Sequence, residues 1–184
     1  GNDYVVIDRC AGTGNLERGL SEDILSHCIV STKEYYEYKV LQELIARRFA
    51  ISSRPSSRGH LRCPVTVRGA DALTQEYVEN PLIRRYIDDP SCTIILFENP
   101  PFAETTSMEH QKRGEGKRSS SGWKASWVLE QMRKAVKENP SISGTSTNDM
   151  GNAFIWSAFE YYLRQPTDSY VVFHLLSTGR PRVS

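Results

Sequence analysis

"VVIDRCAGTGNLERGL" occupies residues 5–20 and combines three features in a fixed order. An apolar, β-branched run comes first, as expected for a strand that is buried on both faces. A Gly-x-Gly turn at Gly12 and Gly14 follows, and apolar residues at helical spacing come next. Because glycine has no side chain, the backbone can turn tightly there and approach a ligand closely. A strand, a glycine turn and a helix in this order are typical of the first unit of a doubly wound sheet.

The remainder of the chain repeats this alternation of short apolar runs and amphipathic segments. The apolar runs predict strands, and the helical spacing of apolar residues predicts helices between most of them. We expect strands at residues 4–7, 27–31, 64–67, 93–97 and 169–176, and helices at residues 15–26, 35–49, 73–87, 124–138 and 149–164. The sequence therefore predicts an α/β fold with a doubly wound, mostly parallel sheet of about five strands.

Length and composition favour a single ordinary globular domain over residues 1–184. Hydrophobic residues make up 39% of the chain and charged residues 24%, which excludes a disordered or fibrous protein. No apolar run approaches the roughly 20 residues of a membrane span, and the first residues lack the basic start of a signal peptide. We expect a cytoplasmic domain with no membrane partner. Because strands are predicted close to both ends, we also expect the chain to be a piece of a longer protein.

The cysteines and histidines of the sequence do not form a pattern with a known chemistry. The four cysteines are Cys10, Cys28, Cys63 and Cys92, and they are scattered singly, without the paired spacing of a zinc site. We interpret them as reduced thiols and expect no metal. The four histidines form no set with an acid and a nucleophile, so hydrolase chemistry has no support.

A second informative stretch, "ENPPFAE" at residues 98–104, follows directly after the predicted strand 93–97. Proline cannot donate to a sheet ladder and fixes its own φ, so Pro100 and Pro101 must lie just beyond the last paired residue. The sequence therefore predicts a rigid corner at the carboxyl edge of the sheet. We interpret Glu98 as a strand-end residue with a partner elsewhere in the fold, in preference to an active-site acid.

The glycine turn by itself is not a dinucleotide-binding fingerprint. That fingerprint requires a third Gly or Ala at the position of Glu17, and a carboxylate there is a poor neighbour for a pyrophosphate at a helix start. We therefore expect a ligand that is not a diphosphate, and a nicotinamide-dependent dehydrogenase is the weakest of the alternatives.

Two motifs carry a resemblance to a known family. Asp8-x-x-Ala11-Gly12-Thr13-Gly14-Asn15-Leu16 resembles the first motif of S-adenosylmethionine-dependent methyltransferases. Asn99-Pro100-Pro101-Phe102 resembles the catalytic motif of the members that methylate amino groups, above all the adenine-specific DNA methylases of restriction-modification systems. The order of the motifs, after the first and the fourth predicted strands, also fits this family.

The resemblance implies a Rossmann-like class I methyltransferase fold, truncated relative to the usual seven strands. It also implies methylation of the exocyclic amino group of adenine, with S-adenosylmethionine as the cofactor. Double-stranded DNA would be bound by the full-length protein, in which we expect a specificity region and a fused or separate nuclease. A net charge of +1 is not typical of a strong nucleic-acid-binding protein, although arginines and lysines gather locally within residues 47–68 and 112–124.

The resemblance assigns cofactor contacts to the first motif. In the family, backbone around the glycine turn holds the methionine part of the cofactor, which implies this role for Ala11, Gly12, Thr13 and Gly14. Asp8 would either orient that turn or meet the amino group of the cofactor.

Three further residues are cofactor candidates after the second and third predicted strands. Glu34 comes about 20 residues after Gly14, where a carboxylate can accept both ribose hydroxyls, and Glu37 is its rival for this role. The aromatic ring of Tyr35 could pack on the adenine ring of the cofactor. Asp71 stands where the family keeps an acid or amide for the adenine amino group.

The chemistry of adenine methylation explains the residues of the second motif. The lone pair of the exocyclic amino group is delocalised into the ring, so attack requires acceptors that favour a pyramidal nitrogen. The side-chain oxygen of Asn99 and the carbonyl of Pro100 supply two such acceptors, and Phe102 offers a stacking face for a flipped base. An RNA base or a protein glutamine poses the same chemical problem and remains an alternative substrate. A degenerate, non-catalytic binding module is the alternative from a different class.

Overall fold

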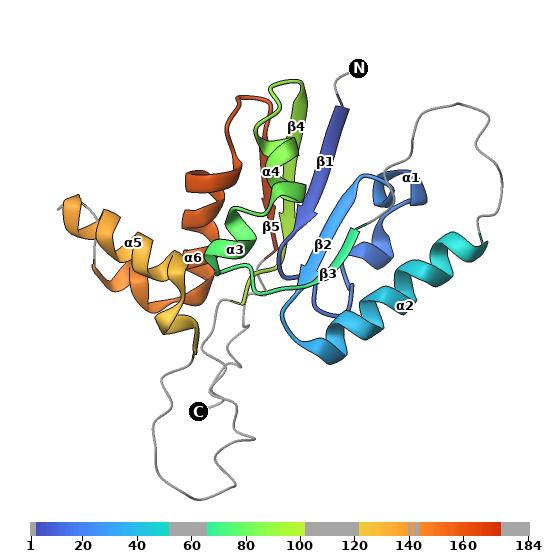
Figure 1. Cartoon of the computed structure of the whole chain (residues 1–184), viewed down its shortest axis with the longest axis horizontal. Helices are drawn as coiled ribbons and strands as arrows, with labels where there is room; N and C mark the ends of the chain where they lie inside the picture. Colours follow the sequence, from blue (N-terminus) through green and yellow to red (C-terminus); the bar gives the residue numbers. More distant parts are fainter. Residues whose placement is uncertain (1–2, 52–65, 102–121, 140, 142–143, 174–184) are drawn as a thin grey trace, which may run out of the picture.

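The computed structural model describes residues 3–51, 66–101, 122–139, 141 and 144–173. The described part of the chain forms helices and strands in alternation (Figure 1). In chain order these are β1 (Asp3–Asp8), η1 (Glu17–Gly19), α1 (Glu22–Leu25), β2 (Cys28–Thr32), α2 (Tyr35–Ile51), β3 (Thr66–Gly69), α3 (Gln75–Val78), α4 (Pro81–Ile87), β4 (Cys92–Glu98), η3 (Gly122–Ala125), α5 (Trp127–Glu138), η4 (Gly144–Asn148), α6 (Met150–Ser157), η5 (Ala158–Tyr162) and β5 (Ser169–Val172).

The strands form one five-stranded parallel sheet in the order β3-β2-β1-β4-β5. The predicted α/β architecture is confirmed, and the all-parallel sheet with flanking helices is consistent with a Rossmann-like fold. The chain runs outward from β1 to β3 and then returns to the other side of β1 with β4. In such sheets ligands bind where the strand order reverses, which here is the edge at the carboxyl ends of β1 and β4.

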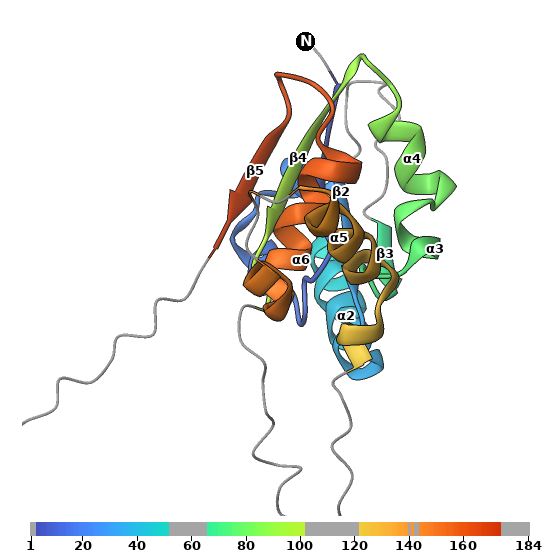
Figure 2. The same cartoon turned by 90° about the vertical axis from the view of Figure 1, so that its left-hand side faces the viewer.

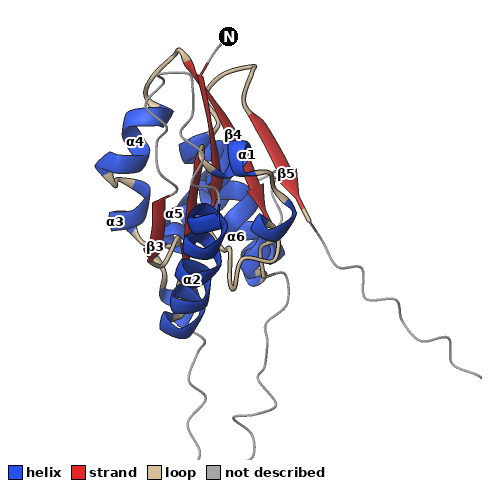
Figure 3. Cartoon of the chain, turned by 90° about the vertical axis from the view of Figure 1, so that its right-hand side faces the viewer, coloured by secondary structure: helices blue, strands red, loops and turns tan. Residues whose placement is uncertain are grey.

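Helices cover both faces of the sheet, as a doubly wound arrangement requires. Alternate residues of β1 point to opposite faces, so Val5 and Ile7 pack in one core cluster and Val6 in the other. Residues of α1 and α2 complete the Val6 cluster (Figure 3), and residues of α3, α4, α5 and α6 complete the Val5 and Ile7 cluster (Figure 2).

The predicted helix at residues 15–26 is wrong. The chain instead forms the single turn η1 and, after an extended Leu20, the short helix α1. Leu20 ends η1, and Ser21 begins α1, because its side chain accepts a hydrogen bond from the Ile24 N–H as an N-cap. The apolar spacing that suggested one helix is shared between two short ones.

Two other predicted helices are each divided into two. The segment 73–87 breaks before Pro81, which cannot donate a backbone hydrogen bond and therefore starts α4 with Asn80 as its N-cap. The segment 124–138 breaks at Ser126, which caps α5. The segment 149–164 begins as expected with Asp149 capping α6, and it continues as the wider turn η5.

Strand boundaries agree with prediction within a few residues where they are described. β3 is described from Thr66 to Gly69, with residues 64–65 of the predicted strand outside the described residues, and β5 ends at Val172 instead of residue 176. Residues 52–65 of the basic stretch 47–68, and residues 112–121 of the basic stretch 112–124, lie outside the described residues. Among the helices that are described, none has the length and apolar character needed to cross a lipid bilayer.

Candidate functional site

The two sequence motifs follow neighbouring parallel strands and lie at the same edge of the sheet. β1 and β4 pair in register from Asp3 opposite Cys92 to Ile7 opposite Leu96. The strands β1 and β4 lie side by side (Figure 1), the glycine turn follows β1, and Asn99 follows β4 in the sequence. This is the edge where the strand order reverses, so the fold places the start of one motif beside the start of the other.

Gly12 and Gly14 both adopt left-handed backbone conformations, with φ of +56° and +85°. A Cβ at Gly14 would lie 2.6 Å from Leu44 Cδ2 and 2.8 Å from Leu41 Cδ1, so this glycine lets the turn pack against α2. A Cβ at Gly12 would meet only Glu37 Oε1, at 3.9 Å. The two glycines therefore have different roles: Gly14 permits internal packing, while Gly12 leaves space beside a carboxylate.

Asp8 anchors the turn from the end of β1. Its Oδ1 accepts a hydrogen bond of 2.8 Å from the Cys10 N–H, which is the orienting role considered for it. The Ala11 N–H donates to the Ser31 carbonyl at 2.9 Å, so the turn is also tied to the end of β2. Thr13 is half-buried at the tip of the same turn. The backbone of the turn is thus held by both neighbouring strands.

Asp8 forms a buried acid pair with Glu17. Both residues are 1% exposed, and Asp8 Oδ2 and Glu17 Oε2 lack a hydrogen-bond partner among the described residues. Burial, and then the charge of Glu17, raise the pKa of Asp8 well above its usual value. Burial likewise raises the pKa of Glu17. The pair therefore favours a state that holds a proton beneath the glycine turn.

A buried ion pair joins the two motifs. The Arg9 Nε–H donates to Glu98 Oε2 at 2.9 Å, and Arg9 Nη2 donates to Glu98 Oε1. Both side chains have no exposed surface. Arg9 directly follows Asp8, and Glu98 directly precedes Asn99, so this pair connects the start of the turn to the start of the corner. Glu98 is the strand-end residue with a distant partner that the sequence indicated.

Further side chains from the flanking elements hold the ion pair in place. Arg9 Nη1 donates to Ser157 Oγ at 2.8 Å and Nη2 donates to the Phe154 carbonyl at 2.9 Å, while the Tyr170 hydroxyl donates to Glu98 Oε1 at 2.7 Å. The guanidinium also lies 4.7 Å from the centroid of the Tyr162 ring. The guanidinium therefore has partners from α6 and η5, and the carboxylate has one from β5.

The network sets the charge states of its members. Burial alone would lower the pKa of Arg9, but the Glu98 carboxylate raises it above its usual value, so the guanidinium stays charged. Burial, and then the charge of Glu98, raise the pKa of Tyr170. Burial raises the pKa of Tyr162 to about 12. Both phenols therefore remain neutral at ordinary pH, and the Tyr170 hydroxyl stays a donor to Glu98.

Asp8, Cys10 and Glu98 approach one another closely enough to be considered as metal ligands. Their ligand atoms lie within 4.8 Å of one another. However, Glu98 already accepts bonds from Arg9 on both oxygens, and burial raises the pKa of the Cys10 thiol. A protonated thiol and a carboxylate saturated by a guanidinium are poor metal ligands, so the cluster is better explained by the ion-pair network.

The predicted catalytic corner lies directly after this network. Asn99 is exposed, Pro100 is buried and Pro101 is exposed, while Phe102 lies outside the described residues. The preceding Glu98 is anchored through its side chain, and its carbonyl accepts a hydrogen bond of 3.0 Å from the Phe173 N–H. The corner therefore presents an accessible amide from a backbone that is fixed on one side.

Of the two rival acids after β2, Glu37 lies beside the glycine turn. Its Oε2 accepts a hydrogen bond of 2.5 Å from Thr32 Oγ1 at the end of β2, and its Oε1 is the atom closest to the open side of Gly12. Glu34 is exposed at the start of α2. Tyr35 is 71% exposed, and Lys39 Nζ lies 5.4 Å from its ring centroid. The structure thus brings Glu37, and not Glu34, next to the turn.

Asp71 lies after β3 at the same edge of the sheet. Its Oδ1 accepts the Leu73 N–H at 3.0 Å, and its Oδ2 pairs with Lys33 Nζ at 3.0 Å. These contacts connect the ends of β2 and β3. The carboxylate is therefore engaged with the chain itself, and no contact links it to the glycine turn within the described part of the structure.

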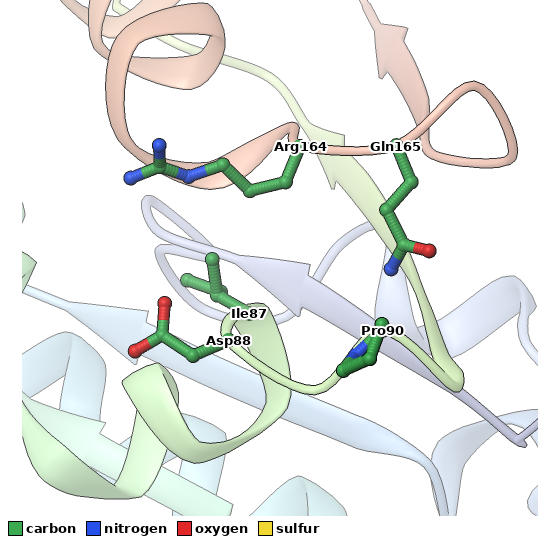
Figure 4. A pocket seen from close by; sticks show the side chains of 5 residues that line it. All are labelled: Ile87, Asp88, Pro90, Arg164 and Gln165. Carbon is green, nitrogen blue, oxygen red and sulfur yellow. The ribbon is translucent and has the colours of Figure 1, made fainter.

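A pocket of about 340 Å³ lies at the opposite edge of the sheet (Figure 4). Its lining comes from the segments that lead into β4 and β5, namely Ile87, Asp88, Pro90, Arg164 and Gln165. The Gln165 side chain donates to the Cys92 carbonyl at 3.0 Å, and Asp88 pairs with Arg84. These contacts position the amino ends of the strands, and the pocket contains none of the predicted site residues.

Sequence reasoning did not assign a role to Arg9 or to Glu17. Arg9 lies inside the first motif, after a strand that is expected to be buried and before the glycine turn. A charged residue at a position where burial is expected needs a buried partner, and this is the signal that could have indicated its role. Glu17 was considered only as an obstacle to phosphate, whereas the fold turns it inward against Asp8.

No protein-family model matches this chain, and no curated protein matches it either. The function must therefore be argued from the two motifs and their surroundings.

Proposed function

We propose that this chain is the catalytic part of an S-adenosylmethionine-dependent methyltransferase that acts on the exocyclic amino group of adenine in DNA, within a restriction-modification system. The observation that supports this proposal most strongly is the adjacency of the two motifs. The turn at Gly12 and the corner at Asn99 follow paired strands at the reversal point of the sheet, and Arg9 and Glu98 connect them.

The residues around the turn fit the proposed cofactor. When bound, S-adenosylmethionine would supply a methyl group on a positively charged sulfur. Gly12 offers backbone without a side chain, and Glu37 offers its Oε1 beside it for a ribose hydroxyl, while its Oε2 accepts from Thr32. Asp8 is buried against Glu17, so it would act by orienting the turn through the Cys10 N–H and by sharing a proton with Glu17. Glu17 is turned inward, so the turn is not shaped as the start of a helix that binds pyrophosphate.

The corner fits the proposed acceptor. The exposed Asn99 amide oxygen and the carbonyl of Pro100 can both accept hydrogen bonds from an amino group. These dipoles would be preorganised, because Glu98 and the proline ring restrict the backbone on either side of them. Preorganised acceptors stabilise a developing pyramidal nitrogen more than the planar ground state, which is the requirement for catalysis. Because an amide takes up no proton, the amino proton would leave to solvent after methyl transfer.

A methyl-transfer assay tests this proposal. The full-length protein is incubated with tritiated cofactor and, in parallel, with double-stranded DNA, RNA or protein. We expect label in DNA as N6-methyladenine, and we expect the Asn99→Ala variant to remove it. Label in RNA or in protein glutamine would keep the chemistry but change the substrate, whereas cofactor binding without transfer to any acceptor would support the non-catalytic module.

A further inference from the structure

The Arg9–Glu98 pair occupies a distinctive position between the two halves of the proposed site. Arg9 belongs to the glycine-turn motif, and Glu98 immediately precedes the proposed catalytic asparagine. The two side chains meet with no exposed surface and bridge β1 and β4 beyond their last paired residues. Their contact therefore links the start of the turn to the start of the corner.

Folding stability alone does not explain why a buried ion pair, Arg9–Glu98, is present at this position. A buried ion pair costs much desolvation free energy, and well-packed apolar side chains of similar volume often serve stability as well or better. What a guanidinium and a carboxylate add is direction, because two parallel hydrogen bonds fix both the distance and the angle between their backbones. Apolar contacts do not impose this restriction.

The surroundings strengthen the directional role. Ser157 and the Phe154 carbonyl, both on α6, orient the guanidinium, while Tyr170 on β5 orients the carboxylate. In addition, the Arg9 N–H itself lies 3.4 Å from Glu98 Oε2, so the carboxylate also contacts the backbone of the turn motif. The pair is thus held in one geometry from two separate elements, α6 and β5.

We infer that Arg9 and Glu98 are positioning residues that set the distance between the cofactor turn and the amino-acceptor corner. This inference rests on the proposed function. Methyl transfer requires the acceptor nitrogen close to and in line with the donor carbon, and a displacement of about 1 Å can cost on the order of a hundredfold in rate. Arg9 and Glu98 touch neither reactant in this account and act only through the backbones that they fix.

Arg9→Lys is the main test variant, because it keeps the positive charge but removes the bidentate hydrogen bonding to Glu98. Asp168→Asn is the matched control. Asp168 holds the same strand at its other end, since its Oδ1 accepts the Ile94 N–H at 2.8 Å, and it is remote from the carboxyl edge. All proteins are compared at a temperature at which circular dichroism shows them folded.

We expect Arg9→Lys to lower turnover at least about tenfold, while the KM for DNA and the cofactor dissociation constant change little, as for residues that align the reacting groups without binding them. Asp168→Asn should keep the turnover of the wild type. Equal turnover in the two variants, after correction for the folded fraction, would overturn the inference. The Arg9–Glu98 pair would then contribute to folding only.

Hydrogen exchange provides a readout that does not depend on activity. Faster exchange at the amides of residues 10–14 and of Asn99 together is expected in Arg9→Lys and not in Asp168→Asn, even if the wild type methylates none of the acceptors. Unchanged exchange at either segment would contradict the coupling. If Arg9→Lys does not fold, Tyr170→Phe serves instead, because it removes one hydrogen bond to Glu98 without removing a charge.

Discussion

Replacement of Gly14 by alanine tests how the glycine turn is built. At φ of +85° any L residue is strained, and a left-handed conformation costs about 1–2 kcal/mol. The new methyl group would also lie 2.6 Å from Leu44 Cδ2 and 2.8 Å from Leu41 Cδ1, and overpacking of this kind costs about 1–3 kcal/mol. We therefore expect Gly14→Ala to lower the free energy of unfolding by about 2–5 kcal/mol.

Two other glycines serve as matched controls. Gly12→Ala shares the left-handed strain but meets only Glu37 Oε1 at 3.9 Å, so its cost should be about 1–2 kcal/mol. Gly19→Ala meets nothing within 4 Å and has no positive φ, so its effect should be close to zero or slightly stabilising.

Urea unfolding with linear extrapolation measures all three variants on one scale. The order of destabilisation should be Gly14→Ala, then Gly12→Ala, then Gly19→Ala. If Gly14→Ala unfolds at the same urea concentration as Gly19→Ala, then the packing of the turn against α2 is not as described here.

Three further predictions concern the carboxyl edge of the sheet. Asn99→Ala should lower turnover by about tenfold to a hundredfold, because Asn99 would act in the transition state. Folding and cofactor affinity should be preserved, because Asn99 is exposed. Unchanged turnover would remove Asn99 from the mechanism. Glu37→Gln should weaken cofactor binding by about tenfold or more in calorimetry, as for the loss of a charged acceptor, whereas Glu34→Gln should have little effect; the reverse order would refute the choice of acid. Burial raises the pKa of Asp8 and of Glu17, so the folded state binds protons more tightly than the unfolded state. The free energy of unfolding should therefore fall as pH rises above the usual carboxyl pKa of about 4. Asp8→Asn should reduce this decline between pH 5 and pH 8, by at most about 1.4 kcal/mol per pH unit, and a variant that follows the wild-type curve would contradict the buried acid pair.

Local pattern was sufficient to predict the sheet. Strands buried on both faces are continuous apolar runs, and each of the five runs became a strand at the expected place in the order. Prolines after residue 97 and glycines after Asp8 mark points where the chain must leave the ladder, so the two corners at the carboxyl edge were also predictable.

The helix boundaries and the buried charged residues were harder to predict from the sequence than the sheet, for different reasons. Apolar spacing gives the face of a helix but not its continuity, so Ser21 and Pro81 divided segments that had been read as single helices. The choice between Glu34 and Glu37 depends on where α2 begins relative to β2, which spacing alone leaves open. Arg9 and Glu17 acquire their roles only from partners 89 and 9 positions away, which the fold must first bring together.

Calorimetric titration of the protein with S-adenosylhomocysteine, the demethylated cofactor, tests the central claim most directly, because it requires no acceptor. The account predicts one-to-one binding that S-adenosylmethionine competes for and a nicotinamide dinucleotide does not. Absence of binding in the full-length protein, or competition by the dinucleotide, would contradict the assignment of the glycine turn to a sulfonium cofactor.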